Sequence, residues 1–329
     1  MTTSTTPAPA QPVVSSRHRT WGFWAPGLPV VLLVLLWMAI AAVEPDFLSA
    51  GSAAAVATQA APLLFLAVGL TPVIILGGID LSLAALTSLA SILLVKFLPG
   101  LGLAGLLLVL AVCAAAGAIV GLVHAVGQIP SFVVTLGAFG LYTGLALQIS
   151  DANNAPLTGH TELVSWTMGT IAGLPAGFAA AVGFAVIVYL AMRYLSFGRY
   201  TYATGAREEA ALMSGVRTGR LRAGLFALAG LSSGLAAVSL VGRTTYASPS
   251  LANTFLLPSI AAVVVGGTAI SGGVGSALRT LAGGLIVTVI QVGLVVVGID
   301  AVLQDVIFGL IIIVAVALTT DRSKLPVIK

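Results

Sequence analysis

Charge is scarce in this chain of 329 residues, because only 7% of the residues are charged and 59% are hydrophobic. An ordinary soluble domain carries roughly 25% charged residues, so a soluble fold is excluded. The apolar runs are unbroken and do not alternate every second residue, which argues against a membrane β-barrel. We therefore expect an all-α fold, a polytopic bundle of transmembrane helices that its 38 glycines allow to pack closely.

Residue types that catalytic sites require are also scarce. The single cysteine, Cys113, lies in an apolar run, so no intramolecular disulfide can form. None of the three lysines is followed by Ser or Thr, so the chain lacks a phosphate-binding loop of the Gly-Lys-Ser/Thr type. The three histidines are far apart in sequence and no carboxylate pair accompanies them, so metal centres and nucleophile triads lack support. We expect no enzyme, no metal, and neither a cofactor nor an ATP site in this chain.

The few charges divide long apolar runs that predict ten spans, with eight or nine as alternatives. The first run resembles a signal peptide but exceeds the usual length of about 7–15 residues, which favours an uncleaved helix. The run before Ile270 is short and glycines interrupt the segment after it, which is typical of a re-entrant or broken helix. The expected spans are 26–43, one between 47 and 79, 81–95, two within 97–150 divided at 127–130, 177–192, 223–241, 256–270, 280–298 and 301–318.

Threading ten spans with the amino terminus inside puts twelve of the fourteen lysines and arginines in the cytoplasm. Only Lys96 and Arg243 then fall outside. The net charge of +4 thus reflects membrane orientation and does not indicate nucleic-acid binding. The expected organisation is a disordered cytoplasmic tail at 1–25, a membrane domain at 26–320 and a cytoplasmic tail at 321–329.

The stretch 193–222 holds eight of the chain's 24 charged residues within 30 positions. We call it the coupling loop. A short helix is predicted from Ala206 to Ser214, stopped by Gly215, since glycine is common just past a helix terminus.

Two carboxylates, Asp80 and Asp305, fall at the edges of apolar runs. Ionisable groups at membrane depth are costly and often functional, but both positions also suit a helix start, where a carboxylate caps the first turn. The segments 77–82 and 266–271 resemble each other, which an internal repeat and a chance match explain equally well. Gly117-x-x-x-Gly121, Gly140-x-x-x-Gly144 and Gly230-x-x-x-Gly234 predict close helix crossings.

Four stretches in order give the chain a resemblance to a known family. They are Phe-Gly-Arg-Tyr at 197–200 with Glu-Glu-Ala-Ala at 208–211, Gly-Gly-Ile-Asp-Leu-Ser at 77–82, Ile-Pro-Ser-Phe-Val-Val-Thr-Leu-Gly at 129–137, and 260–273. They resemble the permease subunits of ribose-type bacterial ABC sugar importers, over about residues 30–320. The family usually has Asn where Arg207 stands, Val-Gly where Leu83-Ala84 stands, and Arg where Val274 stands. These departures bear on local packing or substrate fit and leave the class unchanged.

The resemblance implies a bacterial inner-membrane permease that imports a monosaccharide. It implies three kinds of partner for this permease: two ATPase subunits, which use ATP, a second permease copy or paralogue, and an extracytoplasmic solute-binding protein. It implies that the short helix of the coupling loop contacts the ATPase. The expected coupling residues are Arg207, Glu208, Glu209, Ala210, Ala211, Leu212, Met213, Ser214 and Gly215. The candidate residues of the translocation path are Asp80, Ser82, Ser131, Thr135, Thr268 and Ser271. The alternative role of each is a hydrogen bond between neighbouring helices.

Three other functions stay open at this point. A permease for branched-chain amino acids or another small polar solute fits the same resemblance. A secondary transporter would need ion-coupling charges within the spans, for which only Asp80 and Asp305 are candidates. A membrane enzyme would need a catalytic constellation that the sequence does not contain.

Overall fold

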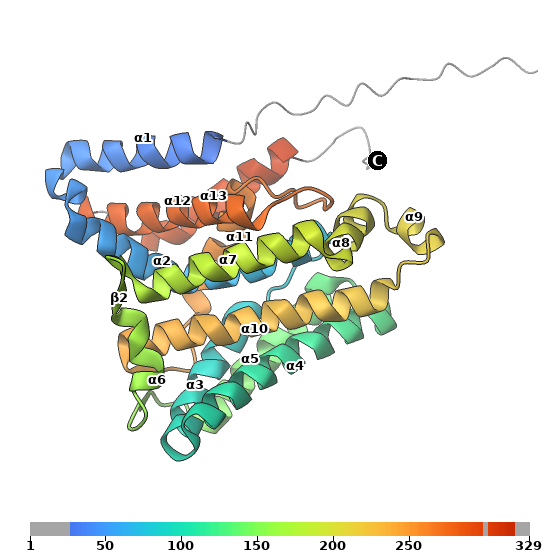
Figure 1. Ribbon diagram of the computed structural model, residues 1–329, viewed down its shortest axis with the longest axis horizontal. Coiled ribbons are helices and arrows are strands. Elements are labelled where there is room, and N and C mark those ends of the chain that lie inside the picture. The colour runs from blue at the N-terminus through green and yellow to red at the C-terminus, as the bar shows by residue number, and fades with distance from the viewer. Residues whose placement is uncertain (1–26, 299–301, 320–329) are drawn as a thin grey trace, which may run out of the picture.

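The computed structural model describes residues 27–298 and 302–319, and this part of the chain folds into a bundle of helices that run roughly side by side (Figure 1). The expected tails at 1–25 and 321–329 lie outside the described residues. The helices are α1 (Leu28–Val43), α2 (Ala50–Ile75), α3 (Leu83–Leu101), α4 (Leu103–Gly127), α5 (Ser131–Ser150), α6 (Glu162–Ser165), α7 (Ala176–Tyr194), α8 (Ser196–Ala206), α9 (Glu208–Met213), α10 (Thr218–Thr244), α11 (Leu256–Val265), α12 (Ala277–Val296) and α13 (Val302–Thr319).

Seven of these helices are long and apolar enough to cross a membrane, which confirms the all-α polytopic fold. They are α2, α3, α4, α5, α7, α10 and α12. Each of the ten apolar segments expected from the sequence coincides with a helix. Of the three that are not among the seven, α1 and α11 are shorter than a full span and α13 has 18 residues. The division expected at 127–130 is confirmed, because α4 ends at Gly127 and α5 begins at Ser131.

Helices α2, α3 and α10 form the centre of the bundle, and most of their length is buried in the described structure. Two of the expected glycine pairs lie where α4 crosses α10. A Cβ added at Gly117 would overlap the carbonyl oxygen of Phe226, and one added at Gly230 would overlap that of Cys113, so neither position tolerates a side chain. Gly140 and Gly144, by contrast, face open space in α5. Two of the three glycine pairs therefore meet at one close crossing within the described part of this chain.

Short elements close the end of the bundle opposite α9. The 3₁₀ helices η2 (Pro45–Leu48), η3 (Trp166–Met168) and η4 (Asn253–Phe255) lie in connections between helices. Antiparallel pairs join β1 (Ala155–Pro156) to β4 (Tyr246–Ala247) and β2 (Thr170–Ile171) to β3 (Leu174–Pro175). The α6 and β2 labels in Figure 1 mark this end, and α8 and α9 mark the other.

The coupling loop contains two helices where one was predicted. Residues 196–206 form α8, and Arg207 adopts an extended conformation (φ −162°, ψ 99°) that separates it from α9. The predicted start at Ala206 was therefore wrong, because that residue belongs to the preceding helix. The predicted stop is confirmed, since Gly215 has a φ of +81° and its amide donates to the carbonyl of Leu212.

Candidate functional site

Helix α9 projects from the end of the bundle (Figure 1), and most of its side chains are exposed. Met213 is 91% exposed and Leu212 is 50% exposed, which is unusual for apolar side chains outside a membrane or an interface. Glu209 lies on the exposed surface as well. Arg207, Ala210, Ser214 and Gly215 are exposed too. Ala211 differs from the other coupling residues, because it is buried and faces the body of the protein.

Glu208 also faces inward and bonds within the chain. Its Oε1 accepts a hydrogen bond from Nη2 of Arg222, which lies in the second turn of α10. The guanidinium of Arg222 is mostly buried and the carboxylate of Glu208 is partly exposed. This ion pair fixes the first residue of α9 to α10, so Glu208 anchors the helix while Glu209 and Met213 remain accessible.

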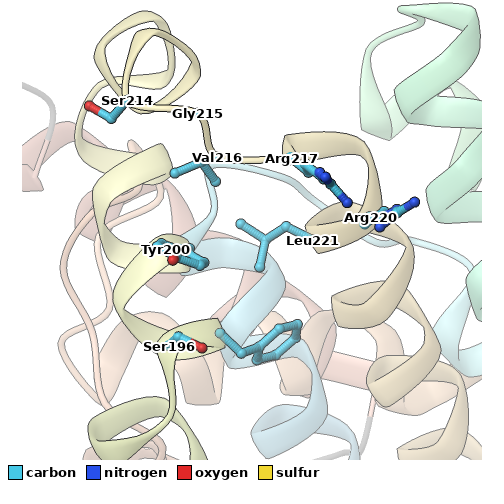
Figure 2. A pocket seen from close by; sticks show the side chains of 9 residues that line it. Ser196, Tyr200, Ser214, Gly215, Val216, Arg217, Arg220 and Leu221 are labelled. Carbon is cyan, nitrogen blue, oxygen red and sulfur yellow. The ribbon is translucent and has the colours of Figure 1, made fainter.

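A cavity of about 410 Å³ lies between α8 and the segment that joins α9 to α10. Figure 2 shows Leu221 and Val216 lying between α8 and α10, with Tyr200 on the α8 side and Arg217 and Arg220 on the α10 side. Both arginines are exposed. The cavity therefore adds a basic rim beside the exposed apolar tip of α9.

Helices α2 and α11 end with the same backbone geometry. In α2 the amides of Gly77 and Gly78 donate to the carbonyls of Ile74 and Val73, and Gly77 has a φ of +93°. In α11 Gly267 and Thr268 repeat this pattern with Val264 and Val263, and Gly267 has a φ of +84°. This paired arrangement is the Schellman motif. The resemblance between the two segments thus extends to backbone conformation, offset by one residue from the alignment of their sequences.

The end of α2 meets the connection that follows α11. The amide of Gly273 donates a 2.8 Å hydrogen bond to the carbonyl of Ile75, the last residue of α2. A Cβ on Gly272 would lie 3.1 Å from the Cα of Gly77. The connection between α11 and α12 therefore supplies a partner for a helix-terminal carbonyl that α2 itself cannot satisfy.

Helix α8 packs directly on this contact. Gly205 abuts the carbonyl of Ile75, and a Cβ there would lie 2.7 Å from the amide nitrogen of Gly273. The hydroxyl of Tyr202 donates a 2.9 Å hydrogen bond to the carbonyl of Gly275. Burial raises the pKa of Tyr202 and the positive charge of Arg279 opposes that shift, so the phenol stays protonated as a donor.

The segment 129–137 joins the same cluster. The amide of Ile79 donates to the hydroxyl of Ser131 at 2.9 Å, and the hydroxyl of Thr135 donates to the carbonyl of Ile79 at 3.3 Å. A cavity of about 320 Å³ separates these residues from α9, and Ile79, Ser131, Glu208 and Arg222 all line it. Three of the motifs found in the sequence are therefore in contact, next to the ion pair that anchors α9.

The remaining candidate path residues lie beside this cluster. Asp80 is buried and its Oδ1 accepts from both the amide (2.8 Å) and the hydroxyl (2.6 Å) of Ser82 at the start of α3. Thr268 is buried and its hydroxyl oxygen has no hydrogen-bond partner among the described atoms. Ser271 is exposed. Asp305 lies in α13, but its side chain is outside the described part.

Sequence reasoning missed Tyr202, Gly205 and Arg222. The first two lie in a stretch where glycines and threonine disfavour a helix, so α8 itself was not expected. Arg222 appeared only as one of several arginines, and its pairing with Glu208 depends on how the chain turns between α9 and α10. A spacing of three between the buried residues Gly198, Thr201 and Thr204 is the one signal that could have revealed the helix.

Comparison with known proteins shows the family to which this chain belongs. Residues 52–316 match the family described as branched-chain amino acid transport system / permease component. The chain is 35% identical over 305 residues to the ribose import permease protein of Bacillus subtilis, covering 90% of this chain and 92% of the relative. It is also 35% identical over 302 residues to a probable ABC transporter permease protein of Escherichia coli, covering 90% of each.

A galactose/methyl galactoside import permease protein of Haemophilus influenzae is 31% identical over 310 residues, which cover 88% of this chain and 91% of the relative. No solved structure matches the chain. The resemblance found in the four motifs is confirmed, and the chain is a transport component and not an enzyme. This multi-pass membrane protein belongs to the branched-chain amino acid transport system / permease component family.

Proposed function

We propose that this chain is the permease subunit of an ABC importer that carries a monosaccharide across the bacterial inner membrane. The names of two relatives, a ribose and a galactose/methyl galactoside import permease, support a pentose or hexose as the solute. The observation that carries the proposal is the exposed apolar tip of α9, joined through α8 to the ends of α2 and α11. Two adjacent exposed apolar side chains on a projecting helix suit contact with a partner that drives movement.

The proposed membrane orientation has ten spans with both termini in the cytoplasm. The distribution of lysine and arginine supports it, because twelve of these fourteen residues then lie inside. In this orientation α8 and α9 lie in the cytoplasm and the β1–β4 pair lies outside the cell membrane. Residues 1–25 and 321–329 are cytoplasmic tails in this proposal, and 26–320 is the membrane domain.

The proposed ATPase contact is the outer face of α9. Glu209, Leu212 and Met213 form its centre, because their side chains are exposed, and Arg207, Ala210, Ser214 and Gly215 surround them. Arg217 and Arg220 extend the surface with positive charge. Glu208 and Ala211 contribute by holding the helix against the permease. A complementary ATPase groove is therefore apolar at its centre and acidic on one side.

The proposed route of coupling runs through α8. Movement of α9 pulls on α8, whose Gly205 and Tyr202 contact the junction of Ile75, Gly273 and Gly275. A shift there changes how the ends of α2 and α11 lie against each other, and paired helix ends of this kind can switch between arrangements. ATP is bound and hydrolysed by the partner subunits, and this chain uses no cofactor in the proposal.

The proposed translocation path passes the cluster formed by 77–82, 129–137 and 266–273. Ser82, Ser131, Thr135, Thr268 and Ser271 give it polar groups, and Asp80 holds the turn before α3. A second copy or a paralogue of the permease completes the path, and a solute-binding protein delivers the sugar from outside.

Transport by the complete importer tests the proposed function. The chain, its ATPase subunits and its solute-binding protein are reconstituted into liposomes, and uptake of labelled ribose, galactose and leucine is measured with and without ATP. We expect ATP-dependent uptake of a sugar. Uptake of leucine instead would support the amino-acid transport in the family's description, and uptake that needs no ATP would indicate a secondary transporter.

A further inference from the structure

A second cavity, of about 590 Å³, lies between α2, α10, α12 and α13. It sits far from the α8 junction, because Gln59 in its wall precedes Ile75 on α2 by about 24 Å of helix at 1.5 Å per residue. In the proposed orientation it opens in the outer half of the membrane domain. The cavity lies within the range typical of small-molecule sites, about 300–1,000 Å³.

Polar side chains from four helices converge on this cavity. The chain has six glutamines, and three of them, Gln59, Gln291 and Gln304, line it together with Arg243. All four side chains are only partly buried. They come from α2, α12, α13 and α10, so the fold gathers groups that are far apart in the sequence. Arg243 lies at the outer end of its span, but the three glutamines lie within α2, α12 and α13, where polar groups are costly, so their convergence on one open space indicates a functional site.

The groups are partly ordered by bonds to one another. Nη1 of Arg243 donates to Oε1 of Gln59, which links α10 to α2. Nε2 of Gln304 donates a 3.2 Å hydrogen bond to the backbone carbonyl of Gln291, which links α13 to α12. The wall is therefore preorganised, and the amide nitrogen of Gln59 and further guanidinium hydrogens of Arg243 remain as donors for a ligand.

A purely structural role accounts for only part of this arrangement. Arg243 lies in the last turn of α10, where a cation is favoured by the helix dipole, and Gln59 satisfies one of its donors. That explanation leaves the carboxamides of α12 and α13 unexplained, because apolar residues would pack two helices without the cost of burying amides.

The chemistry of the lining selects the class of ligand. Carboxamides offer both donors and acceptors, which matches hydroxyl groups that also do both. One guanidinium among three neutral amides gives little preference for an anion, and the exposed side chains of Val295 and Val296 supply an apolar surface for the carbon face of a ring. A neutral polyol such as a monosaccharide fits this lining better than a phosphate or a leucine side chain.

We infer that this cavity is a binding site for a neutral sugar within the permease, occupied between release from the solute-binding protein and passage of the α2 and α11 ends. The inference rests on the proposed function and deepens it, because it assigns the sugar to Gln59, Arg243, Gln291 and Gln304. None of these residues was among the candidates predicted from the sequence.

Uptake by the reconstituted importer provides the first test. Gln291→Leu keeps the volume of the side chain and removes its hydrogen bonds, so ribose uptake at low concentration should fall about tenfold, as expected for loss of one good hydrogen bond. Gln148→Leu is the matched control, since Gln148 is exposed on α5 outside the cavity. ATP hydrolysis stimulated by the binding protein, measured on the same samples, should stay near the wild-type rate and shows that the variant folds and assembles.

Failure of the inference differs from failure of the proposed function. If the wild-type importer takes up ribose or galactose and Gln291→Leu matches it, the sugar site is wrong and the importer stands. If the wild type carries none of these sugars, the proposed function is wrong and the assignment of a sugar to this cavity falls with it.

Chemical protection gives a second test that does not depend on transport rates. Thr254→Cys, in a Cys113→Ser background, puts a thiol at the exposed rim of the cavity, and Ser250→Cys puts one on exposed loop surface outside it. With the full importer and its binding protein present, ribose should slow maleimide labelling of the first thiol severalfold and leave the second unchanged. Equal labelling of Thr254→Cys with and without saturating ribose would overturn the site.

Discussion

The amide of Gly273 caps the carbonyl of Ile75 at 2.8 Å, so the connection between α11 and α12 completes the end of α2. The preceding carbonyls of α2 are already satisfied by the amides of residues 76–78, and this bond accounts for the next one. A buried carbonyl without a partner would cost roughly 1–3 kcal/mol, so the two helix ends stay together unless another arrangement supplies a partner. The Gly205 contact on α8 lies directly against this bond.

Gly205→Ala should weaken the junction. The new methyl group would overlap the carbonyl of Ile75 and approach the amide of Gly273, so α8 must move away from the helix ends. Overpacking of this kind costs about 1–3 kcal/mol. We expect a lower midpoint of thermal unfolding in detergent and a lower ratio of sugar transported to ATP hydrolysed.

Gly183→Ala is the control for that substitution. Gly183 lies in α7 and a Cβ there would meet no atom within 4 Å, so alanine should leave both readouts unchanged or raise stability slightly through its better helix propensity. Wild-type behaviour of Gly205→Ala would show that α8 does not press on the junction.

Tyr202→Phe should loosen the same junction by removing the bond to the carbonyl of Gly275. The expected loss of stability is about 1 kcal/mol, the usual net value of one hydrogen bond. Tyr200→Phe is the matched control, because Tyr200 lies on the same helix and is 47% exposed, whereas the hydroxyl of Tyr202 donates to the carbonyl of Gly275. Denaturation curves of the two variants would test the difference, and equal curves would contradict a role for Tyr202.

Exchanging the charges of Glu208 and Arg222 shows whether Glu208 holds α9 against α10 or contacts the ATPase directly. Glu208→Arg alone brings two cations together and should displace α9, which lowers uptake. Adding Arg222→Glu restores an ion pair in the opposite sense, so the double variant should recover most of the uptake. If Glu208 instead contacts the ATPase directly, the second substitution will not rescue the first.

Asp80 gives opposite expectations for two substitutions. Asp80→Asn keeps an oxygen that accepts from the amide and hydroxyl of Ser82, so fold and transport should persist if the carboxylate acts as a cap. Asp80→Ala removes both bonds and should destabilise the protein by about 1–2 kcal/mol. Loss of uptake in Asp80→Asn with normal stability would instead show that transport requires the negative charge.

The sequence alone predicts the parts of this fold that depend on local chemistry. Unbroken apolar runs located the helices, the turn at 127–130 divided α4 from α5, and Gly215 stopped α9 as expected. The Gly117 and Gly230 contact was predictable as well, because small residues at this spacing allow close crossing. These features need no knowledge of which helices are neighbours.

The remaining features depend on tertiary packing. Helix α8 forms in spite of poor helix formers, since its buried face at residues 198, 201 and 204 gains stability from contact with the rest of the bundle. The three path motifs could be identified in the sequence, but their meeting at Ile79 and Gly77 depends on the arrangement of α2, α5 and α11. The sequence also does not show which face of α9 is buried, because a helix of six residues is too short for a clear period of apolar residues.

The exposed tip of α9 is the centre of the proposed ATPase contact, and replacing it by charge should break that contact. Leu212→Asp with Met213→Asp leaves the buried Ala211 and the Glu208–Arg222 pair intact, so the permease should still fold and insert. Measured in liposomes with the ATPase subunits and the solute-binding protein, ATP-dependent sugar uptake should fall at least about tenfold, as for loss of an apolar anchor in an interface. Uptake equal to that of the wild type would show that the tip of α9 is not the ATPase contact.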